Sequence, residues 1–253
     1  MMNQQKPFRL ITIPVSHYCE KVRWALTRIK VDFVEEPHSP PFHLFVTKRL
    51  GGKTTPILVA DTEIFTDSTD ILKYLNSITL DENKLYPSNP ELRQKVEELE
   101  ELFDTRLGTA TRRWGYSYIS NNYKIIQRAW CQGVPKIQKI LFPLSFISMQ
   151  KILQKSFDLT TESHLESYLE IKVLFAQVGE LLADGRNYLV GDKFSAADLT
   201  FAALAAPVIQ PAEHPIKPRS LEELPIKMAS EIKEFRETSA GQFVLKLYRE
   251  RNV

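Results

Sequence analysis

Cysteine is scarce in this sequence. The chain of 253 residues contains two cysteines, Cys19 and Cys131. Two thiols are too few for the disulfide framework of a small secreted protein, which favours a reducing compartment. The sequence starts Met-Met-Asn-Gln-Gln-Lys-Pro and lacks the apolar core of a secretory signal. We therefore expect a cytoplasmic protein.

Long apolar runs and metal-ligand patterns are also missing. A membrane-spanning helix needs about 20 apolar residues, whereas the nearest run, 199–209, is shorter and contains Pro207. His43, His164 and His214 stand at no metal-ligand spacing, so we expect no metal. The proportions of 43% apolar and 25% charged residues are those of a globular protein, and the length suits one large domain or two modest ones.

Acidic residues are absent from the segment Thr105–Phe157. Its cations are Arg106, Arg112, Arg113, Lys124, Arg128, Lys136, Lys139, Lys151 and Lys155. The net charge of the whole chain is only +2, so the remainder is acidic. The basic segment either attracts an anionic ligand or a phospholipid surface, or forms a solvated face neutralised by acidic helices. No nucleic-acid-binding motif accompanies it, so we expect no nucleic-acid partner.

The first third of the chain alternates between strand and helix patterns. Apolar runs and turn residues predict strands at 8–13 and 31–35, and a hairpin at 56–60 and 63–65. Helical spacing of apolar residues predicts helices at 19–29 and 67–78. These elements predict an α/β domain over residues 1–85, with a small mixed sheet covered by helices.

The composition changes at the proline-rich link 86–90, and the pattern beyond it is helical. Helices are predicted at 91–113, at 162–183, from Ser195 onward, and at 230–248 in two pieces around Gly241. Ser195 and Asp198 have the spacing of a capping box, which we assign to folding. An all-helical domain over residues 91–253 is therefore predicted.

The junction between the first strand and its helix carries two chemically useful side chains. Ser16 and Cys19 stand in the stretch Ser-His-Tyr-Cys, at the predicted start of the helix. A helix N-terminus stabilises an anion through unpaired backbone N–H groups and the helix dipole. A thiolate is one such anion, so the junction suits thiol chemistry.

Four motifs together resemble the cytosolic glutathione S-transferase superfamily. They are Ser16-His17-Tyr18-Cys19, Thr54-Thr55-Pro56-Ile57-Leu58-Val59, Phe65-Thr66-Asp67-Ser68, and the stretch Leu189 to Leu199 with its capping box. They stand in the order of the family and span most of the chain. The resemblance implies a thioredoxin-like N-terminal domain followed by an all-α helical C-terminal domain, and leaves the transferase class open.

The resemblance implies glutathione as the co-substrate and assigns residues to it. Ser16 would meet the sulfur, and the main chain of Thr55 before Pro56 would pair with the cysteinyl main chain of glutathione. Asp67 and Ser68 would hold the γ-glutamyl end, although the same residues also suit an ordinary helix N-cap. Lys53 would pair with the glycyl carboxylate.

The sequence is compatible with three functions. The first is a glutathione transferase in which Ser16 favours the thiolate for attack on an electrophilic carbon or a peroxide, with a role in detoxification. The second is a thiol transferase that uses Cys19 as its nucleophile. The third is a non-catalytic binder or scaffold for hydrophobic anions. The family further implies a homodimer.

Tyr18, Arg113, Trp114 and Tyr118 are the candidates for the co-substrate pocket, and they would suit a hydrophobic or anionic molecule. The stretch between Asn121 and Asp158 departs from the family, whose corresponding joint is short. Its lysines and aliphatic residues would form an amphipathic membrane-surface segment, a lid, or an extension of the helical core. We favour the core interpretation over membrane-surface contact.

Overall fold

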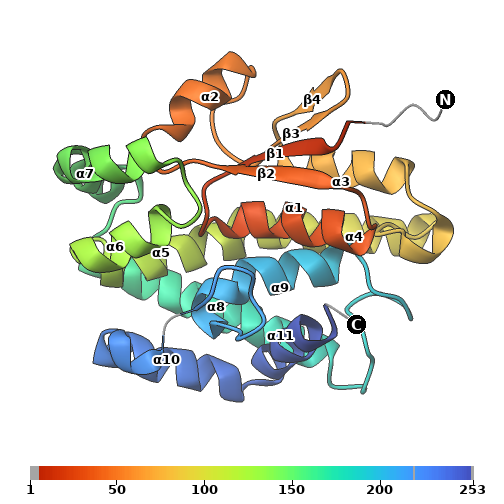
Figure 1. Ribbon diagram of the computed structural model, residues 1–253. Coiled ribbons are helices and arrows are strands. Elements are labelled where there is room, and N and C mark those ends of the chain that lie inside the picture. The colour runs from red at the N-terminus through yellow and green to blue at the C-terminus, as the bar shows by residue number, and fades with distance from the viewer. Residues whose placement is uncertain (1–5, 219, 252–253) are drawn as a thin grey trace. The chain divides into compact units, whose positions relative to one another are not determined.

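The computed structural model describes residues 6–218 and 220–251 of the chain (Figure 1). Their contacts divide them into two compact units. The first comprises the residues up to Lys84 together with Asn122–Gln150. The second comprises Leu85–Asn121 together with the residues from Lys151 onward.

A four-stranded sheet forms the centre of the first unit. Its strands are β1 (Phe8–Thr12), β2 (Phe33–Pro37), β3 (Ile57–Ala60) and β4 (Glu63–Phe65), in the order β2-β1-β3-β4. β1 and β2 are parallel, and the other two pairs are antiparallel. This confirms the predicted mixed sheet. β2 begins two residues later than predicted, because Lys30 adopts a φ of 56° in the turn that ends the preceding helix.

Helices cover both faces of this sheet. α1 (His17–Arg28) and α3 (Ser68–Ser77) contact each other on one face, and α2 (His43–Arg49) lies on the other (Figure 1). Val22, Ala25 and Leu26 of α1 are fully buried, as their helical spacing predicted. A short 3₁₀ turn, Asp81–Asn83, follows α3.

The stretch that departs from the family forms α6 (Tyr123–Trp130) and α7 (Lys136–Ser156). The Gln138 side-chain oxygen accepts hydrogen bonds from the Ser39 backbone N–H at 2.9 Å and the Ser39 hydroxyl at 3.3 Å. The Phe142 ring is fully buried, with its centroid 6.2 Å from that of Trp130. α6 and the first part of α7 therefore belong to the sheet-containing unit, and the prediction that they extend the helical core is wrong.

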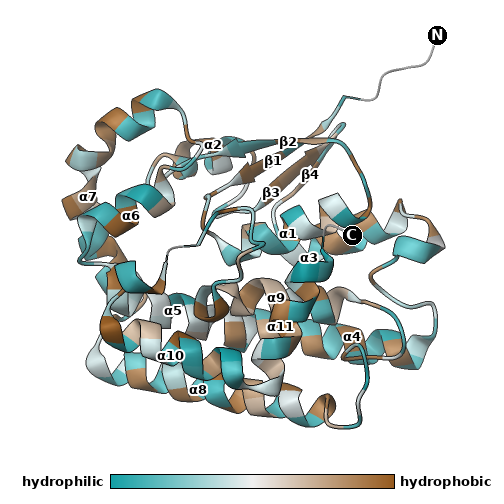
Figure 2. Ribbon diagram, turned by 60° about the horizontal axis from the view of Figure 1, so that its bottom comes forward, coloured by the Kyte–Doolittle hydropathy of each residue, from teal (hydrophilic) through white to brown (hydrophobic). Residues whose placement is uncertain are grey.

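The second unit is helical. Its elements are α4 (Pro90–Leu102), a π-helical turn (Phe103–Leu107), α5 (Gly108–Ile119), α8 (Thr161–Leu181), α9 (Ala196–Ile209), a 3₁₀ turn (Leu221–Glu223), α10 (Ile226–Glu237) and α11 (Ser239–Glu250). α9 is apolar almost throughout, and every residue in it except Pro207 is buried (Figure 2). It contacts α4, α5, α10 and α11 and so forms the centre of this unit. No helix in the described ranges is long and apolar enough to cross a membrane.

The break between the last two helices lies at Thr238, three residues before the predicted position. The Thr238 hydroxyl caps α11 by accepting the Gly241 backbone N–H at 3.0 Å. A Cβ atom on Gly241 would lie 2.0 Å from the Phe235 carbonyl oxygen. Gly241 is therefore required by a close backbone approach, and its presence does not mark the end of a helix.

Asp198 closes the predicted capping box of α9 and is fully buried. Its carboxylate accepts the Leu189 N–H at 2.7 Å and the Ser195 N–H and hydroxyl, each at 2.8 Å. Burial raises the pKa of Asp198 to about 6. We expect Asp198→Ala to lower the free energy of unfolding by about 2–4 kcal/mol, because three buried donors lose their acceptor.

Urea unfolding at a pH above 7, where the carboxyl is ionised, measures this change. Asp192→Ala is the matched control, because Asp192 lies in the same loop with an exposed side chain. The control should change the free energy of unfolding by less than about 0.5 kcal/mol. Equal effects of the two substitutions would contradict the assignment of Asp198 to folding.

His43 begins α2 and is buried, and no described residue hydrogen-bonds its Nδ1 atom. Burial, with a smaller contribution from the charge of His38, lowers the pKa of His43 to about 4. The unfolded chain would bind this proton near pH ~6.5, so the unfolded state takes up more protons below that pH. The contribution of His43 to stability should therefore fall as the pH drops from about 6.5 towards 4.

A titration of the His43 ring protons by NMR should give a pKa near the low value rather than the ordinary one. Over this interval the unfolding free energy of the wild type should fall by about 2 kcal/mol relative to that of His43→Leu. An ordinary histidine pKa, or the same acid sensitivity in His43→Leu, would contradict this prediction.

Candidate active site

The sheet topology brings three of the sequence motifs to one edge. The end of β1 lies beside the start of β3, since Ile11 pairs with Ile57. The end of β4 lies there too, since Leu58 pairs with Phe65. The loop after β1, the Thr55–Pro56 turn before β3 and the Asp67–Ser68 start of α3 therefore meet at the same end of the sheet.

Ser16 is the N-cap of α1. Its backbone is extended, with φ −68° and ψ 120°, and its Oγ accepts the Cys19 backbone N–H at 3.3 Å. The side chain is half-buried. A hydroxyl that accepts a hydrogen bond keeps its own hydrogen for donation. That hydrogen is directed to the Cys19 sulfur, and the Ser16 hydroxyl lies at the positive end of a helix.

Cys19 lies one turn further on and is fully buried. Burial raises the pKa of its thiol. The charge of Arg23, the hydroxyls of Ser16 and Thr55 and the backbone of Ile13 act in the opposite direction without overcoming burial. A reactive cysteine needs both exposure and a lowered pKa, and Cys19 has neither.

The Thr55–Pro56 peptide bond is cis. Thr55 is buried, and its hydroxyl hydrogen-bonds the Cys19 sulfur, which places this turn directly against the start of α1. Lys53, two residues earlier, is exposed. The structure thus brings Ser16 and Thr55 together around one buried thiol.

Asp67 is the N-cap of α3 and is exposed, whereas Ser68 is buried in the first turn. The Asp67 Oδ1 atom accepts the backbone N–H groups of Thr69 at 2.8 Å and Asp70 at 3.3 Å. Both bonds use the same carboxylate oxygen. Asp67 therefore caps the helix while leaving Oδ2 without a hydrogen-bond donor among the described residues.

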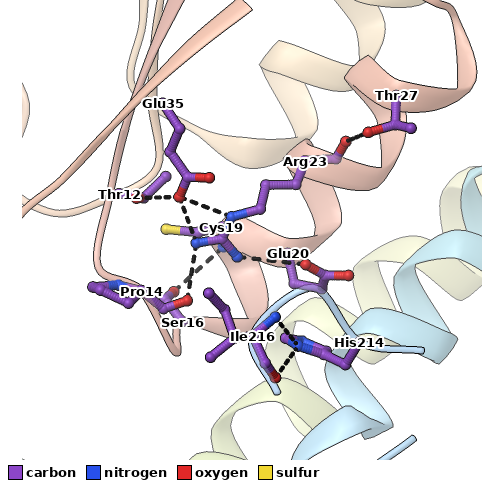
Figure 3. A network of polar contacts seen from close by, with 10 residues as sticks. All are labelled: Thr12, Pro14, Ser16, Cys19, Glu20, Arg23, Thr27, Glu35, His214 and Ile216. Atoms are coloured by element: carbon purple, nitrogen blue, oxygen red, sulfur yellow. Dashed lines mark hydrogen bonds and ion pairs between the residues drawn. The ribbon is translucent and has the colours of Figure 1, made fainter. Parts of the chain in front are cut away.

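A buried ionic network supports the loop that carries Ser16 (Figure 3). The Arg23 guanidinium donates to the Pro14 carbonyl at 2.9 Å and lies 2.8 Å from the Glu35 carboxylate and 3.4 Å from that of Glu20. The Thr12 hydroxyl donates to the same Glu35 oxygen at 2.6 Å. Arg23 therefore ties the loop after β1 to β2.

Sequence analysis does not single out Arg23, which stands between the apolar positions of α1. Arg23 and Lys21 are both buried, and the Lys21 ammonium donates to the Thr69 hydroxyl of α3 at 3.3 Å. Two acidic residues in the sequence could have indicated that Arg23 is paired: Glu20, three residues before it, and Glu35 on the neighbouring predicted strand.

The co-substrate candidates lie in different environments. Tyr18 is half-buried, and its ring lies 4.7 Å from that of His17. In the helical unit, Trp114 is fully buried, and its indole N–H donates to Glu231 at 2.6 Å. The Tyr118 ring lies edge-on to Trp114 at 5.5 Å, and Arg113 is half-exposed. Trp114 therefore belongs to the core of its unit, where it supports Tyr118.

Among the described residues, no cluster of His, Cys, Asp and Glu side chains has the arrangement of a metal site. At this end of the sheet, Arg23 pairs with Glu20 and Glu35, and Asp67 caps α3. The chemistry that this end offers is hydrogen-bond donation to an anion, from Ser16 and from the start of α1.

Comparison with known proteins identifies the fold family. The family model for the glutathione S-transferase N-terminal domain matches residues 10–80. A glutathione transferase from Phanerochaete chrysosporium has a TM-score of 0.64 at 16% identity, with 98% of both chains covered. One from Ceriporiopsis subvermispora in complex with glutathione has a TM-score of 0.60 at 17% identity, again covering 98% of both chains.

The β-etherase LigF from Sphingobium sp. strain SYK-6 has a TM-score of 0.59 at 17% identity, covering 95% of this chain and 99% of the other. No curated protein sequence matches this chain significantly. The chain therefore contains a region that matches the glutathione S-transferase N-terminal domain, and it shares the glutathione transferase fold over nearly its whole length.

Proposed function

We propose that this protein binds glutathione and activates it as a thiolate through the Ser16 hydroxyl. The observation that carries the proposal is the contrast between the two candidate residues. Ser16 presents a half-buried hydroxyl at the N-cap of α1, whereas Cys19 is fully buried and has a raised pKa. A donor to the sulfur lowers the pKa of the bound thiol, because it stabilises the charged form.

Glutathione would be held along the same end of the sheet. The Thr55 main chain would pair with the cysteinyl main chain of glutathione. The N-terminus of α3 at Ser68 would take the γ-glutamyl carboxylate, and Asp67 Oδ2 would take the γ-glutamyl ammonium. Lys53, exposed beside the turn, would pair with the glycyl carboxylate.

The reaction follows from the thiolate. Glutathione releases its thiol proton to solvent, and the sulfur attacks an electrophilic carbon, so that an S–C bond forms and the leaving group departs with its electron pair. With a hydroperoxide, the sulfur attacks the terminal oxygen, so that an S–O bond forms, the O–O bond breaks and the alcohol departs. The thiol of a second glutathione then attacks the resulting sulfenic sulfur and displaces water, which gives glutathione disulfide.

The co-substrate side of the proposal rests on Tyr18, Arg113 and Tyr118, with Trp114 as the buried support of Tyr118. Aromatic rings and a guanidinium suit a hydrophobic or anionic co-substrate. Following the family, the proposal extends to a cytoplasmic homodimer with a role in detoxification.

Calorimetric titration with glutathione, followed by turnover assays, tests this function. We expect saturable binding of glutathione and its consumption with 1-chloro-2,4-dinitrobenzene or cumene hydroperoxide. An ether belongs in the panel because one structural neighbour is named a β-etherase. Binding of hydrophobic dyes without turnover of any co-substrate would instead support a non-catalytic binder.

A further inference from the structure

α7 presents an exposed apolar stripe that its own fold does not use. Ile137, Ile140, Leu144 and Ile147 are 59%, 69%, 82% and 66% exposed. Their spacing of three, four and three residues places them along one side of the helix. We call these four residues the outer stripe. Figure 2 shows hydrophobic residues recurring along α7.

The opposite side of α7 already anchors the helix. Gln138, Phe142 and Met149 are buried there. Gln138 bonds to Ser39, and Phe142 packs among aromatic rings that include Trp130. Packing within the unit is therefore satisfied without the outer stripe. Exposed large aliphatic side chains in a continuous row mark an interaction surface.

The charges around the outer stripe have one sign. Lys136, Lys139, Lys151 and Lys155 of α7 are exposed, and none forms an ion pair with a residue that the structure describes. Elsewhere in the same acid-free segment, Arg106 is paired with Glu170 of α8 at 2.5 Å. Neutralisation by acidic helices therefore accounts for Arg106 and does not extend to α7.

We propose that α7 binds the surface of an anionic lipid bilayer, with the outer stripe among the upper acyl chains and the lysines at the lipid phosphates. Apolar residues flanked by lysines on one helix are the pattern of an interfacial helix. Each lysine near an anionic surface adds to the attraction. This proposal is independent of the glutathione chemistry.

Other occupants fit less well. A second copy of the chain would bring lysines against lysines, since α7 carries no acidic residue. A nucleic acid would gain nothing from the outer stripe, because aliphatic side chains neither stack on bases nor pair with phosphates. An acidic protein would satisfy the lysines, and the test below distinguishes it from lipid.

Co-sedimentation of the full chain with lipid vesicles tests the proposal. We expect binding to phosphatidylcholine vesicles that contain phosphatidylglycerol, weakening as salt is raised, and much weaker binding to phosphatidylcholine alone. The double variant Ile140→Gln/Leu144→Gln should bind at least about tenfold more weakly. Lys136→Gln/Lys139→Gln should also weaken binding about tenfold, since each lysine contributes.

Leu165→Gln/Leu169→Gln is the matched control. These residues are four positions apart on α8 and are 54% and 51% exposed. The control should bind vesicles as the wild type does. All variants change exposed side chains, so circular dichroism spectra and melting midpoints should match the wild type.

Three results would overturn the proposal. The first is that the wild-type protein does not bind anionic vesicles. The second is that the Ile140→Gln/Leu144→Gln variant binds them as tightly as the wild type. The third is that the outer stripe binds a second copy of the chain or an acidic protein in place of lipid. If the Ile140→Gln/Leu144→Gln variant loses dimerisation in sedimentation velocity while it still binds vesicles normally, the outer stripe contacts a second copy of the chain. Binding of polyglutamate as tight as vesicle binding would identify an acidic protein.

Discussion

Ser16→Ala is expected to lower kcat/KM for glutathione conjugation about 10- to 100-fold while lowering the free energy of unfolding by only about 1 kcal/mol. The activity loss reflects a hydrogen bond to a charged sulfur, worth about 1.5–3 kcal/mol. The stability loss reflects the N-cap of α1, where Ser16 accepts the Cys19 N–H.

The pH–rate profile separates the catalytic role of Ser16 from its capping role. Without the hydroxyl, the apparent pKa of the bound thiol should rise, so the activity of Ser16→Ala should recover towards alkaline pH. Loss of a cap alone would not move this pKa. Urea unfolding of the same variant measures the stability component separately.

Cys19→Ala is the control for the competing mechanism. Cys19 is fully buried, so its replacement should cost about 1–2 kcal/mol of stability through lost packing. Its kcat/KM should stay within about threefold of the wild type, because the thiol has neither exposure nor a lowered pKa. An inactive Cys19→Ala beside an active Ser16→Ala would reverse the assignment and support a thiol transferase.

Arg23→Met is expected to lower the free energy of unfolding by about 3–5 kcal/mol. Burial works to lower the pKa of Arg23, but the hydrogen bond and charge of Glu35, together with Glu20, raise it overall, so the guanidinium stays charged. Removing it takes the Arg23 ion pair from buried Glu20 and frees the Pro14 carbonyl. The loop that carries Ser16 loses its attachment to β2.

Arg9→Met is the matched control for this substitution. Arg9 pairs with Glu36 across β1 and β2, but the two side chains are 46% and 32% exposed. Its loss should cost less than about 1 kcal/mol, because a solvated ion pair contributes little. Denaturant unfolding of both variants makes the comparison, and equal losses would contradict the network. Adding Glu20→Gln to Arg23→Met should recover part of the stability, because it removes a buried charge that Arg23 no longer balances.

Much of the fold follows from local sequence. Apolar spacing located α1, α3 and α8, and the hairpin of β3 and β4 followed from two short apolar runs around Asp61. The capping box at Ser195 was also visible, because its partners are three residues apart. Such features depend on neighbours in the chain, and a single sequence displays them directly.

The features that sequence reasoning missed depend on distant partners. Arg23 is buried because Glu35 lies beside it on β2, twelve positions away. The segment that forms α7 is predicted to extend the helical core, but composition does not reveal which side of a helix has a neighbour. Trp114 is predicted to line the co-substrate pocket, yet it is buried in the core of its unit, where its indole N–H donates to Glu231, far along the chain.

A crystal structure of the full chain with glutathione tests the central claim most directly. We expect the glutathione sulfur to lie within about 3.5 Å of Ser16 Oγ. The γ-glutamyl end should lie at Asp67 and Ser68, and Cys19 should remain buried as a free thiol. Glutathione joined to Cys19 by a disulfide, or bound with its sulfur away from Ser16, would contradict it.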